Sequence, residues 1–275
     1  MSAALGFNAA MAVLLERRVS TAAKWSRRTA LFSATLLVST VLGHRSGLID
    51  TISLFWLLGL VAAMALLAIV LAVLGYAQLW EFGDRGGRNS TKGLILALIV
   101  LVPFCLATHR LLTLPGLVDV STDLSDPPTF HHAISQRDSS MNTLAYFDRG
   151  NAAVQAEAYP EVSGRRYALG LDVALDIVAA TTEELGWSTH ERARLGGFGG
   201  IVTLEVIAPS PWLGLISDVA IRLRDEGDAI YVDLRAASRY GVHDLGGNAA
   251  AITRFYAAME AEIADRNALF QAPAE

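Results

Sequence analysis

The chain has 275 residues, a hydrophobic fraction of 53% and a formal net charge of -5 at pH 7. This apolar excess excludes an ordinary soluble domain and indicates a membrane protein that carries a water-soluble part. Residues up to Thr113 carry ten Lys and Arg against four Asp and Glu, whereas the remainder carries twelve against twenty-three. The acidic remainder excludes nucleic acid as a partner, because binding phosphates requires a clustered basic face.

Three apolar stretches in the first part predict transmembrane helices at about 29–46, 52–79 and 93–112. The second stretch has about 28 uncharged residues, more than the roughly 20 that a bilayer requires. The third is also long enough, and Pro103 is tolerated there because neighbouring helices satisfy the freed carbonyl. The first stretch is short and contains hydroxyl side chains such as Ser33, so its assignment as a span depends on the flanking charges.

Basic residues set the expected orientation. A cluster of five lies between Arg17 and Arg28, three more lie between Arg85 and Lys92, and only Arg45 lies between the first two stretches. With three spans, both basic segments face the cytoplasm, as the positive-inside rule requires. We therefore expect a bacterial inner-membrane protein with a cytoplasmic N-terminus and everything after Thr113 outside. The spans carry no central charge, which argues against a transporter.

The residues from 114 to 165 predict an irregular linker or entry segment. Pro127-Pro128 forbids a regular helix there. The three carboxylates of this segment are interpreted as solvated, because their spacing does not match a calcium loop; they are Asp119, Asp123 and Asp126.

No metal or other cofactor is expected. His131 and His132 are adjacent in sequence, which does not suit two ligands of one metal ion. Cys105 is the only cysteine, so neither an internal disulfide nor a thiolate metal cluster can form.

The residues from 166 to 275 predict a compact domain. Helical spacing of apolar residues indicates amphipathic helices at 167–185 and 245–264, and a strand at 201–208 follows a glycine-rich loop. Strict alternation in 218–224 and 229–235, around an Asp-Glu-Gly-Asp turn, predicts a hairpin with one buried face. The predicted fold class is an extracytoplasmic α+β domain, an antiparallel sheet of three or four strands covered by helices on one face, attached to an N-terminal bundle of three transmembrane helices.

The stretch from Arg235 to Asn248, RAASRYGVHDLGGN, resembles the signature of the DUF1499 family, in which a strand reading R-S-x-S-R-x-G-x-S-D-L-G-x-N precedes a helix. Thr122–Phe130, TDLSDPPTF, is similar to the entry segment of membrane-anchored bacterial members, and the resemblance spans about 117–263. It implies a fold unit and an envelope location but no activity. This chain departs from the pattern at Ala236 and His243, where members have serines, and at Ala249–Ala251, where they often carry basic residues.

Six residues of this stretch form the candidate site: Ser238, Arg239, Gly241, Asp244, Gly246 and Asn248. In a structural interpretation, Asp244 caps the final helix and pairs with Arg239, while Asn248 ties the helix to the preceding strand. The glycines provide positive φ or close backbone approach.

Two functional interpretations use the same atoms. Arg239, Ser238 and the glycine amides at a helix N-terminus could receive a phosphate or carboxylate, such as a lipid head group. Alternatively, Ser238 could act with His243 and Asp244 in a hydrolase, although Ser238 lacks the G-x-S-x-G setting.

The function predicted from the sequence is a non-catalytic extracytoplasmic binding or assembly domain on an inner-membrane protein. Its expected partners are membrane lipids and either an anionic ligand or an envelope protein. The alternative is an enzyme that acts on an envelope lipid or a small anion.

Overall fold

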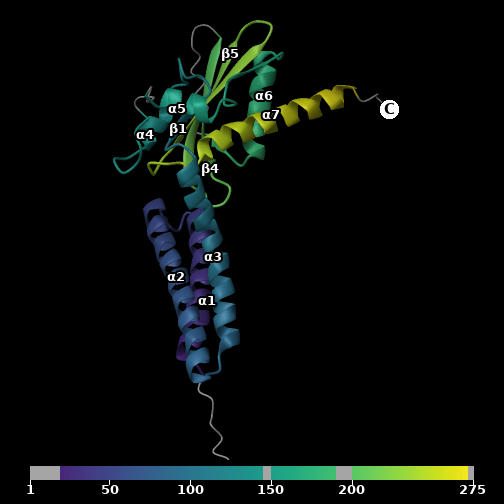
Figure 1. Ribbon diagram of the computed structural model, residues 1–275. Helices are drawn as coiled ribbons and strands as arrows, with labels where there is room; N and C mark the ends of the chain where they lie inside the picture. The colour runs from purple at the N-terminus through teal and green to yellow at the C-terminus, as the bar shows by residue number, and fades with distance from the viewer. Residues whose placement is uncertain (1–18, 145–149, 190–199, 272–275) are drawn as a thin grey trace, which may run out of the picture. The chain divides into compact units, whose positions relative to one another are not determined.

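The computed structural model describes residues 19–144, 150–189 and 200–271, which belong to two compact units divided between Cys105 and Leu106 (Figure 1). Most of the glycine-rich loop expected before residue 201 lies outside the described residues. Each unit is described by itself below.

The N-terminal unit consists of long helices. Helix α1 spans Thr21–Arg45, α2 spans Thr51–Phe82, and α3 spans Gly87–Thr113 and so continues into the second unit. Side-chain oxygens cap the N-termini of α1 and α2. The Ser20 hydroxyl accepts the N–H of Ala23, and the Asp50 carboxylate accepts the N–H of Ser53.

Small side chains face the interior of this unit. Ala30, Ala65 and Ala97 lie in its core, and the Ser26 hydroxyl donates to the Ala68 carbonyl across 2.9 Å. Large apolar side chains are exposed instead, among them Leu67, Val70 and Ile99. Helices in lipid pack in this way, because lipid chains solvate large apolar side chains and small residues permit close approach.

Two helices, α2 and α3, are long and apolar enough to span a membrane, with mean hydropathy values of 3.0 and 2.2 in their most apolar windows. The sequence led us to expect three such helices, and among the described residues α1 does not qualify. The helix begins eight residues earlier than expected, but its apolar part, residues 29–43, is too short and contains several hydroxyl side chains. Arg28 and Arg45 flank this part.

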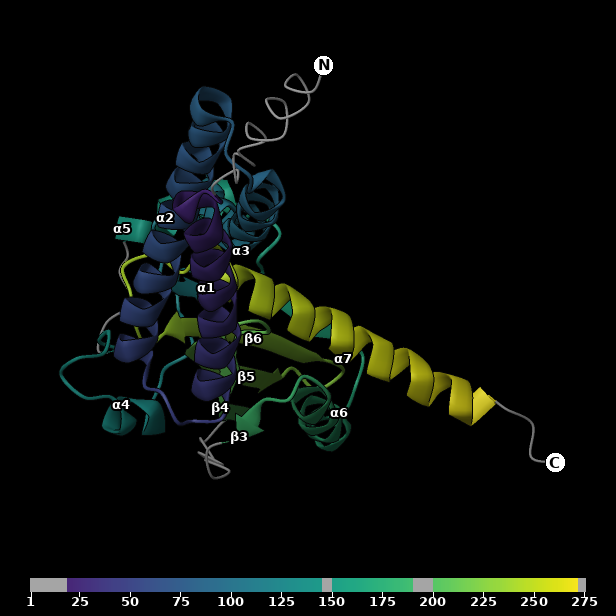
Figure 2. The ribbon, with the colours of Figure 1, turned by 90° about the horizontal axis from the view of Figure 1, so that it is seen from below.

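The C-terminal unit contains an antiparallel sheet in the order β1-β6-β5-β4-β3, and Figure 2 shows β6 to β3 lying side by side. Strand β2 pairs with a separate stretch of β6. The bounds are β1 Asp119–Ser121, β2 Arg165–Tyr167, β3 Ser188–Thr189, β4 Ile201–Pro209, β5 Ile216–Asp225 and β6 Ile230–Ser238. The predicted hairpin is confirmed as β5 and β6. The prediction of three or four strands was too low, because β1, β2 and β3 are only two or three residues long and leave no alternating pattern in the sequence.

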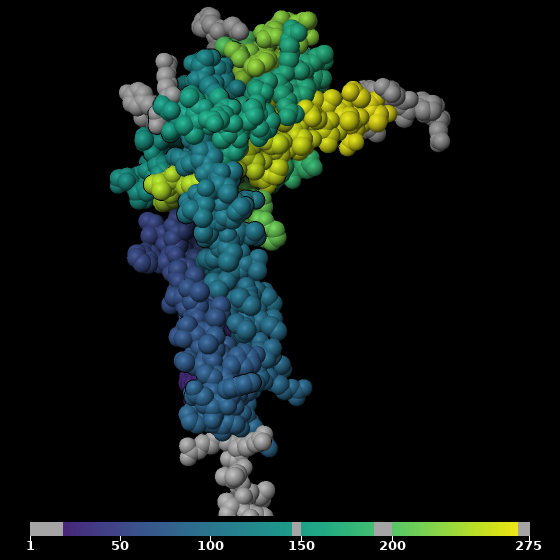
Figure 3. Space-filling view, in the orientation of Figure 1, coloured from purple at the N-terminus to yellow at the C-terminus, as the bar shows by residue number. Residues whose placement is uncertain are grey.

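In the described part of this unit, four further helices follow: α4 His132–Gln136, α5 Gly150–Ala158, α6 Leu171–Glu184 and α7 Gly247–Gln271. Helix α6 begins four residues later than expected, because Arg165–Tyr167 pairs with β6 instead. The segment expected to be irregular, 114–165, contributes β1, α4 and α5. Helix α7 extends beyond the body of this unit (Figure 3).

One face of the sheet forms the hydrophobic core with α6 and α7. The amphipathic character predicted for the last helix is confirmed, since its apolar residues Ile252, Phe255, Tyr256 and Met259 are buried and Ile263 packs at the margin. Phe255 stacks on the Trp187 ring at 5.8 Å between centroids. This face therefore consists of the apolar positions that the alternating pattern assigns to the interior.

Candidate functional site

The opposite face of the sheet is charged and also buried. The strand register places Thr203, Arg222 and Asp233 in one row across β4, β5 and β6, and Glu205 and Arg235 in the next. Phe130, Ala133 and Leu144 from the segment after β1 pack over this face. The expectation of one covered face is therefore wrong, because this segment covers the second.

An arginine cluster lies beneath this segment. The Arg222 guanidinium pairs with Asp233 at 3.0 Å, Asp126 at 2.9 Å and Asp123 at 3.2 Å, and Arg224 reaches Asp233 at 2.9 Å. Burial raises the pKa of Asp233 above its ordinary value, although both guanidinium groups favour the charged form. Asp123 is therefore ion-paired to the sheet and largely buried, which corrects the expectation that it is solvated. Asp126 is also ion-paired, but its side chain is 76% exposed, so it remains a solvated carboxylate.

Two further buried charges fix the covering segment. Arg235 pairs with Asp119 at 2.6 Å, and its guanidinium lies 4.9 Å from the centre of the Phe130 ring. The Glu205 carboxylate accepts three backbone N–H groups, from His131 at 2.6 Å, His132 at 3.0 Å and Ala133 at 2.7 Å. These contacts compensate the cost of removing both charges from water.

Asp218 joins this face to the candidate turn. Arg137 and Arg239 each contact its carboxylate at 2.7 Å, and the Arg137 guanidinium also donates to the carbonyls of Ala237 and Ser238. The predicted pairing of Arg239 with Asp244 is wrong. Arg239 pairs instead with the buried Asp218, which strand β5 places beside the end of β6. The Asp244 carboxylate accepts backbone N–H groups at the start of α7.

The predicted cap on the final helix is present. The Asp244 carboxylate accepts the N–H groups of Gly246 and Asn248, both at 2.8 Å. The backbone turns here through positive φ angles, +91° at Gly241, +54° at Leu245 and +76° at Gly246. Burial raises the pKa of Asp244, while the two N–H groups act in the opposite direction.

Asn248 ties the start of α7 to strands β5 and β6 and to Val118, the residue before β1. Its amide nitrogen donates to the Val118 carbonyl at 2.9 Å and to the Ser238 hydroxyl at 3.0 Å, and its amide oxygen accepts from Ser217 at 2.8 Å. The expected connection to the preceding strand is therefore present. The anion-receptor role stays a prediction, and an incoming anion would have to compete with Asp218 at Arg239 and with Asp244 at the helix amides.

The candidate hydrolase residues have other partners. The Ser238 hydroxyl lies near Ser217 and Asn248, at 3.3 and 3.0 Å. The His243 ring accepts the Leu245 N–H at Nδ1, so Nε2 carries the proton and donates to the Leu114 carbonyl at 3.1 Å. This arrangement does not pair the serine with a base.

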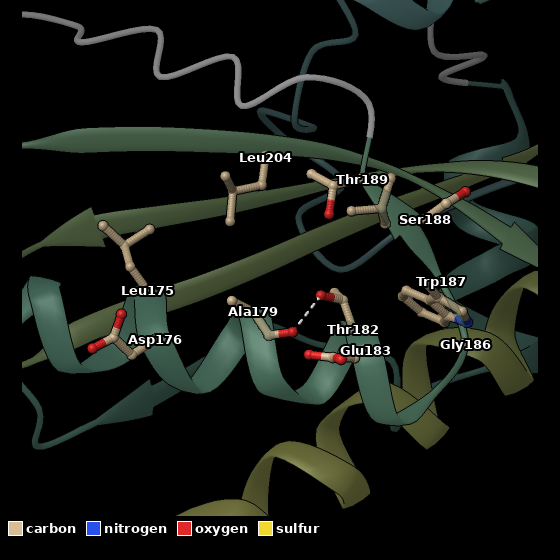
Figure 4. Close-up of a pocket in the computed structure, with 11 residues that line it drawn as sticks. Leu175, Asp176, Ala179, Thr182, Glu183, Gly186, Trp187, Ser188, Thr189 and Leu204 are labelled. Atoms are coloured by element: carbon tan, nitrogen blue, oxygen red, sulfur yellow. Dashed lines mark hydrogen bonds between the residues drawn. The ribbon is translucent and has the colours of Figure 1, made fainter.

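A cavity of about 740 Å³ lies between α6, β3 and β4 (Figure 4). Its apolar walls include Leu175, Leu204 and Trp187, and carboxylates of α6 lie among its lining residues. The Thr182 hydroxyl donates to the Ala179 carbonyl at 2.8 Å. Ligand-binding pockets commonly have this volume and this mixture of apolar and polar lining.

Reasoning from the sequence missed both the cavity and the charged face. The sequence did contain a signal for the charged face. Alternation in β5 places Asp218, Arg222 and Arg224 on one face of the strand, and alternation in β6 places Asp233 and Arg235 on that same face of the sheet. The cavity has no such signal, since its walls come from separate elements. Within the described ranges, no group of three or more His, Cys, Asp or Glu side chains could hold a metal ion.

Comparison with known proteins gives one match. A family model described as "Protein of unknown function (DUF1499)" matches residues 119–259, a little more than half of the chain. No curated protein and no solved structure matches the chain. The matched residues run from β1 into α7 and include the charged face, the cavity and the turn.

Proposed function

The chain belongs to the DUF1499 family of proteins of unknown function, and from this premise we propose that it is an integral membrane protein displaying a non-catalytic extracytoplasmic binding or assembly domain. The family name supplies no reaction. The proposal is therefore argued from the two units of the structure.

The membrane part of the proposal is supported by burial and charge. Only 22% and 11% of the most apolar windows of α2 and α3 are buried inside the protein, unlike core helices of a soluble domain. We propose that α1 also crosses, because this keeps the basic residues before it on the same side as Arg85, Arg88 and Lys92. The C-terminal unit then lies outside the bacterial inner membrane, with the N-terminus in the cytoplasm.

The single observation that carries the binding role is the cavity between α6, β3 and β4. Its lining combines apolar walls with the carboxylates of Asp176 and Glu183, and the Thr182 hydroxyl is engaged by a backbone carbonyl. Such a surface suits a ligand with an apolar body and a neutral or cationic polar group. Retention of that ligand requires no catalytic group.

The test is native mass spectrometry of the full-length chain extracted from membranes in detergent. Ala179→Trp fills the cavity, so we expect a small molecule bound to the unaltered chain to be lost from this variant. Ala261→Trp is the matched control, because Ala261 lies on the exposed face of α7. A chain that carries no small molecule, or one that Ala179→Trp retains, would contradict the binding role of this cavity.

A further inference from the structure

The turn between β4 and β5 is unusually apolar for a surface turn. Between the two strands, from Ser210 to Leu215, the chain reads SPWLGL and contains no charged residue. Trp212 is 86% exposed at the tip of this turn. Turns in water favour Gly, Asn, Asp and Ser, and a side chain as large as Trp is normally buried at least in part.

A second exposed apolar side chain lies on the neighbouring turn. Val242, between β6 and α7, is 89% exposed. Strands β5 and β6 are paired from Ser217 and Ser238 onward, and the Arg239 N–H donates to the Ile216 carbonyl at 3.1 Å. The two turns therefore lie side by side at one end of the sheet. We call Trp212 and Val242 the entry-end patch.

This is also the end at which the chain enters the C-terminal unit from α3. The Asp244 N–H donates to the Leu117 carbonyl at 3.0 Å, and the His243 ring donates to the Leu114 carbonyl. Helix α3 ends at Thr113, so only three residues separate it from Leu117. The four residue-to-residue steps from Thr113 to Leu117 reach at most about 14 Å, since an extended residue spans no more than about 3.6 Å.

We infer that the entry-end patch inserts into the interfacial region of the bilayer, with Trp212 as its anchor. The inference rests on the proposed function, in which α3 crosses the membrane. The short connection keeps the patch within reach of the membrane surface at which α3 emerges. Trp is enriched at that depth, because its ring is apolar and its indole N–H can still bond to head groups or water. A lipid surface also suits a patch that offers no charge to a protein partner.

The test uses the full-length chain in lipid nanodiscs with an environment-sensitive thiol fluorophore. Trp212→Cys in a Cys105→Ser background places the probe on the patch. Asp228→Cys is the matched control, because it lies in the exposed β5–β6 turn at the other end of the sheet. We expect the probe at position 212 to have blue-shifted emission, to be quenched by lipids spin-labelled near the head group, and to be protected from iodide. The probe at position 228 should show the opposite pattern.

Two other outcomes decide against the inference. A probe at position 212 that iodide quenches as strongly as the probe at 228 shows that the patch faces water. Protection from iodide without quenching by spin-labelled lipid shows that protein covers the patch, as in a dimer. A probe on the native, exposed Cys105 of α3 separates the two proposals. If lipids spin-labelled at mid-chain quench the Cys105 probe, α3 spans the membrane and only the insertion of the patch is contradicted. If they do not quench it, the proposed membrane span is contradicted as well.

Discussion

The role of Arg239 suggested by the sequence differs from its contacts in the structure. Beside glycines and a helix start, it suggested a receptor for an anion. In the structure it shares the buried Asp218 with Arg137, which also holds backbone carbonyls at the end of β6. A buried carboxylate needs such partners, because an unpaired charge inside a protein is strongly destabilising.

We therefore expect Arg239→Ala to lower the free energy of unfolding by about 1–3 kcal/mol, the usual value for losing hydrogen bonds to a charged group. Arg137 remains at Asp218 and limits the loss. The measurement is thermal unfolding of the full-length chain in detergent, with Arg254→Ala on the exposed face of α7 as the control. If both variants are equally stable, Arg239 does not stabilise the fold, and binding of an anionic ligand becomes the better interpretation of this residue.

At the scale of elements, the segment from Thr122 to Leu144 acts as a polar cover over the second face of the sheet. Its start is a compact turn in which one Asp123 oxygen accepts from the N–H groups of Ser125 and Asp126, at 3.0 and 2.9 Å. The other oxygen contacts Arg222. Burial alone would raise the pKa of Asp123, but these hydrogen bonds and Arg222 bring it below its ordinary value.

This lowered pKa predicts a specific response to acid. A depressed carboxyl pKa contributes stability above its unfolded value, 3.8, and this contribution is lost as pH falls through the lower folded value. Asp123→Asn keeps a turn oxygen but loses the charge, so its melting temperature should fall less than that of the unaltered chain on acidification from about pH 6 to about pH 3. Asp265→Asn, at an exposed position of α7, should behave like the unaltered chain. Equal acid sensitivity in all three chains would contradict the role of Asp123.

At the scale of the whole molecule, the two units require different surroundings. The N-terminal unit exposes its large apolar side chains and buries small ones, whereas the C-terminal unit has an apolar core and a sheet face of compensated charges. The first pattern suits lipid, and the second suits water. This combination supports the proposal that the chain is anchored in a membrane.

Single-cysteine variants in a Cys105→Ser background test the proposed topology with an impermeant maleimide on intact spheroplasts. Ala261→Cys should be labelled at once, and Glu81→Cys only after permeabilisation. Val19 pairs with Arg85 in the structure, so Val19→Cys should be labelled only after permeabilisation, as Glu81→Cys is, and its labelling in intact spheroplasts would contradict a crossing α1. Labelling of Glu81→Cys but not Ala261→Cys in intact spheroplasts would reverse the orientation and contradict an extracytoplasmic domain.

The sequence by itself determined the features whose signal is local. Long apolar runs indicated α2 and α3, and alternation indicated the β5–β6 hairpin. Helical spacing indicated α7, and the SR-G-DLG-N pattern indicated the family. The cap by Asp244 belongs with these features, because its partners are only two and four residues away.

Only the tertiary structure decided which residues pair over long distances. Strands β1, β2 and β3 are too short to carry a periodic signal, and their pairing comes from partners remote in sequence. The partners of Asp123 and Arg239 likewise depend on the register of β5, which places Arg222 and Asp218 on the face that the covering segment buries. A charged side chain forms an ion pair with whichever opposite charge the fold brings close, and adjacency in sequence does not determine that choice.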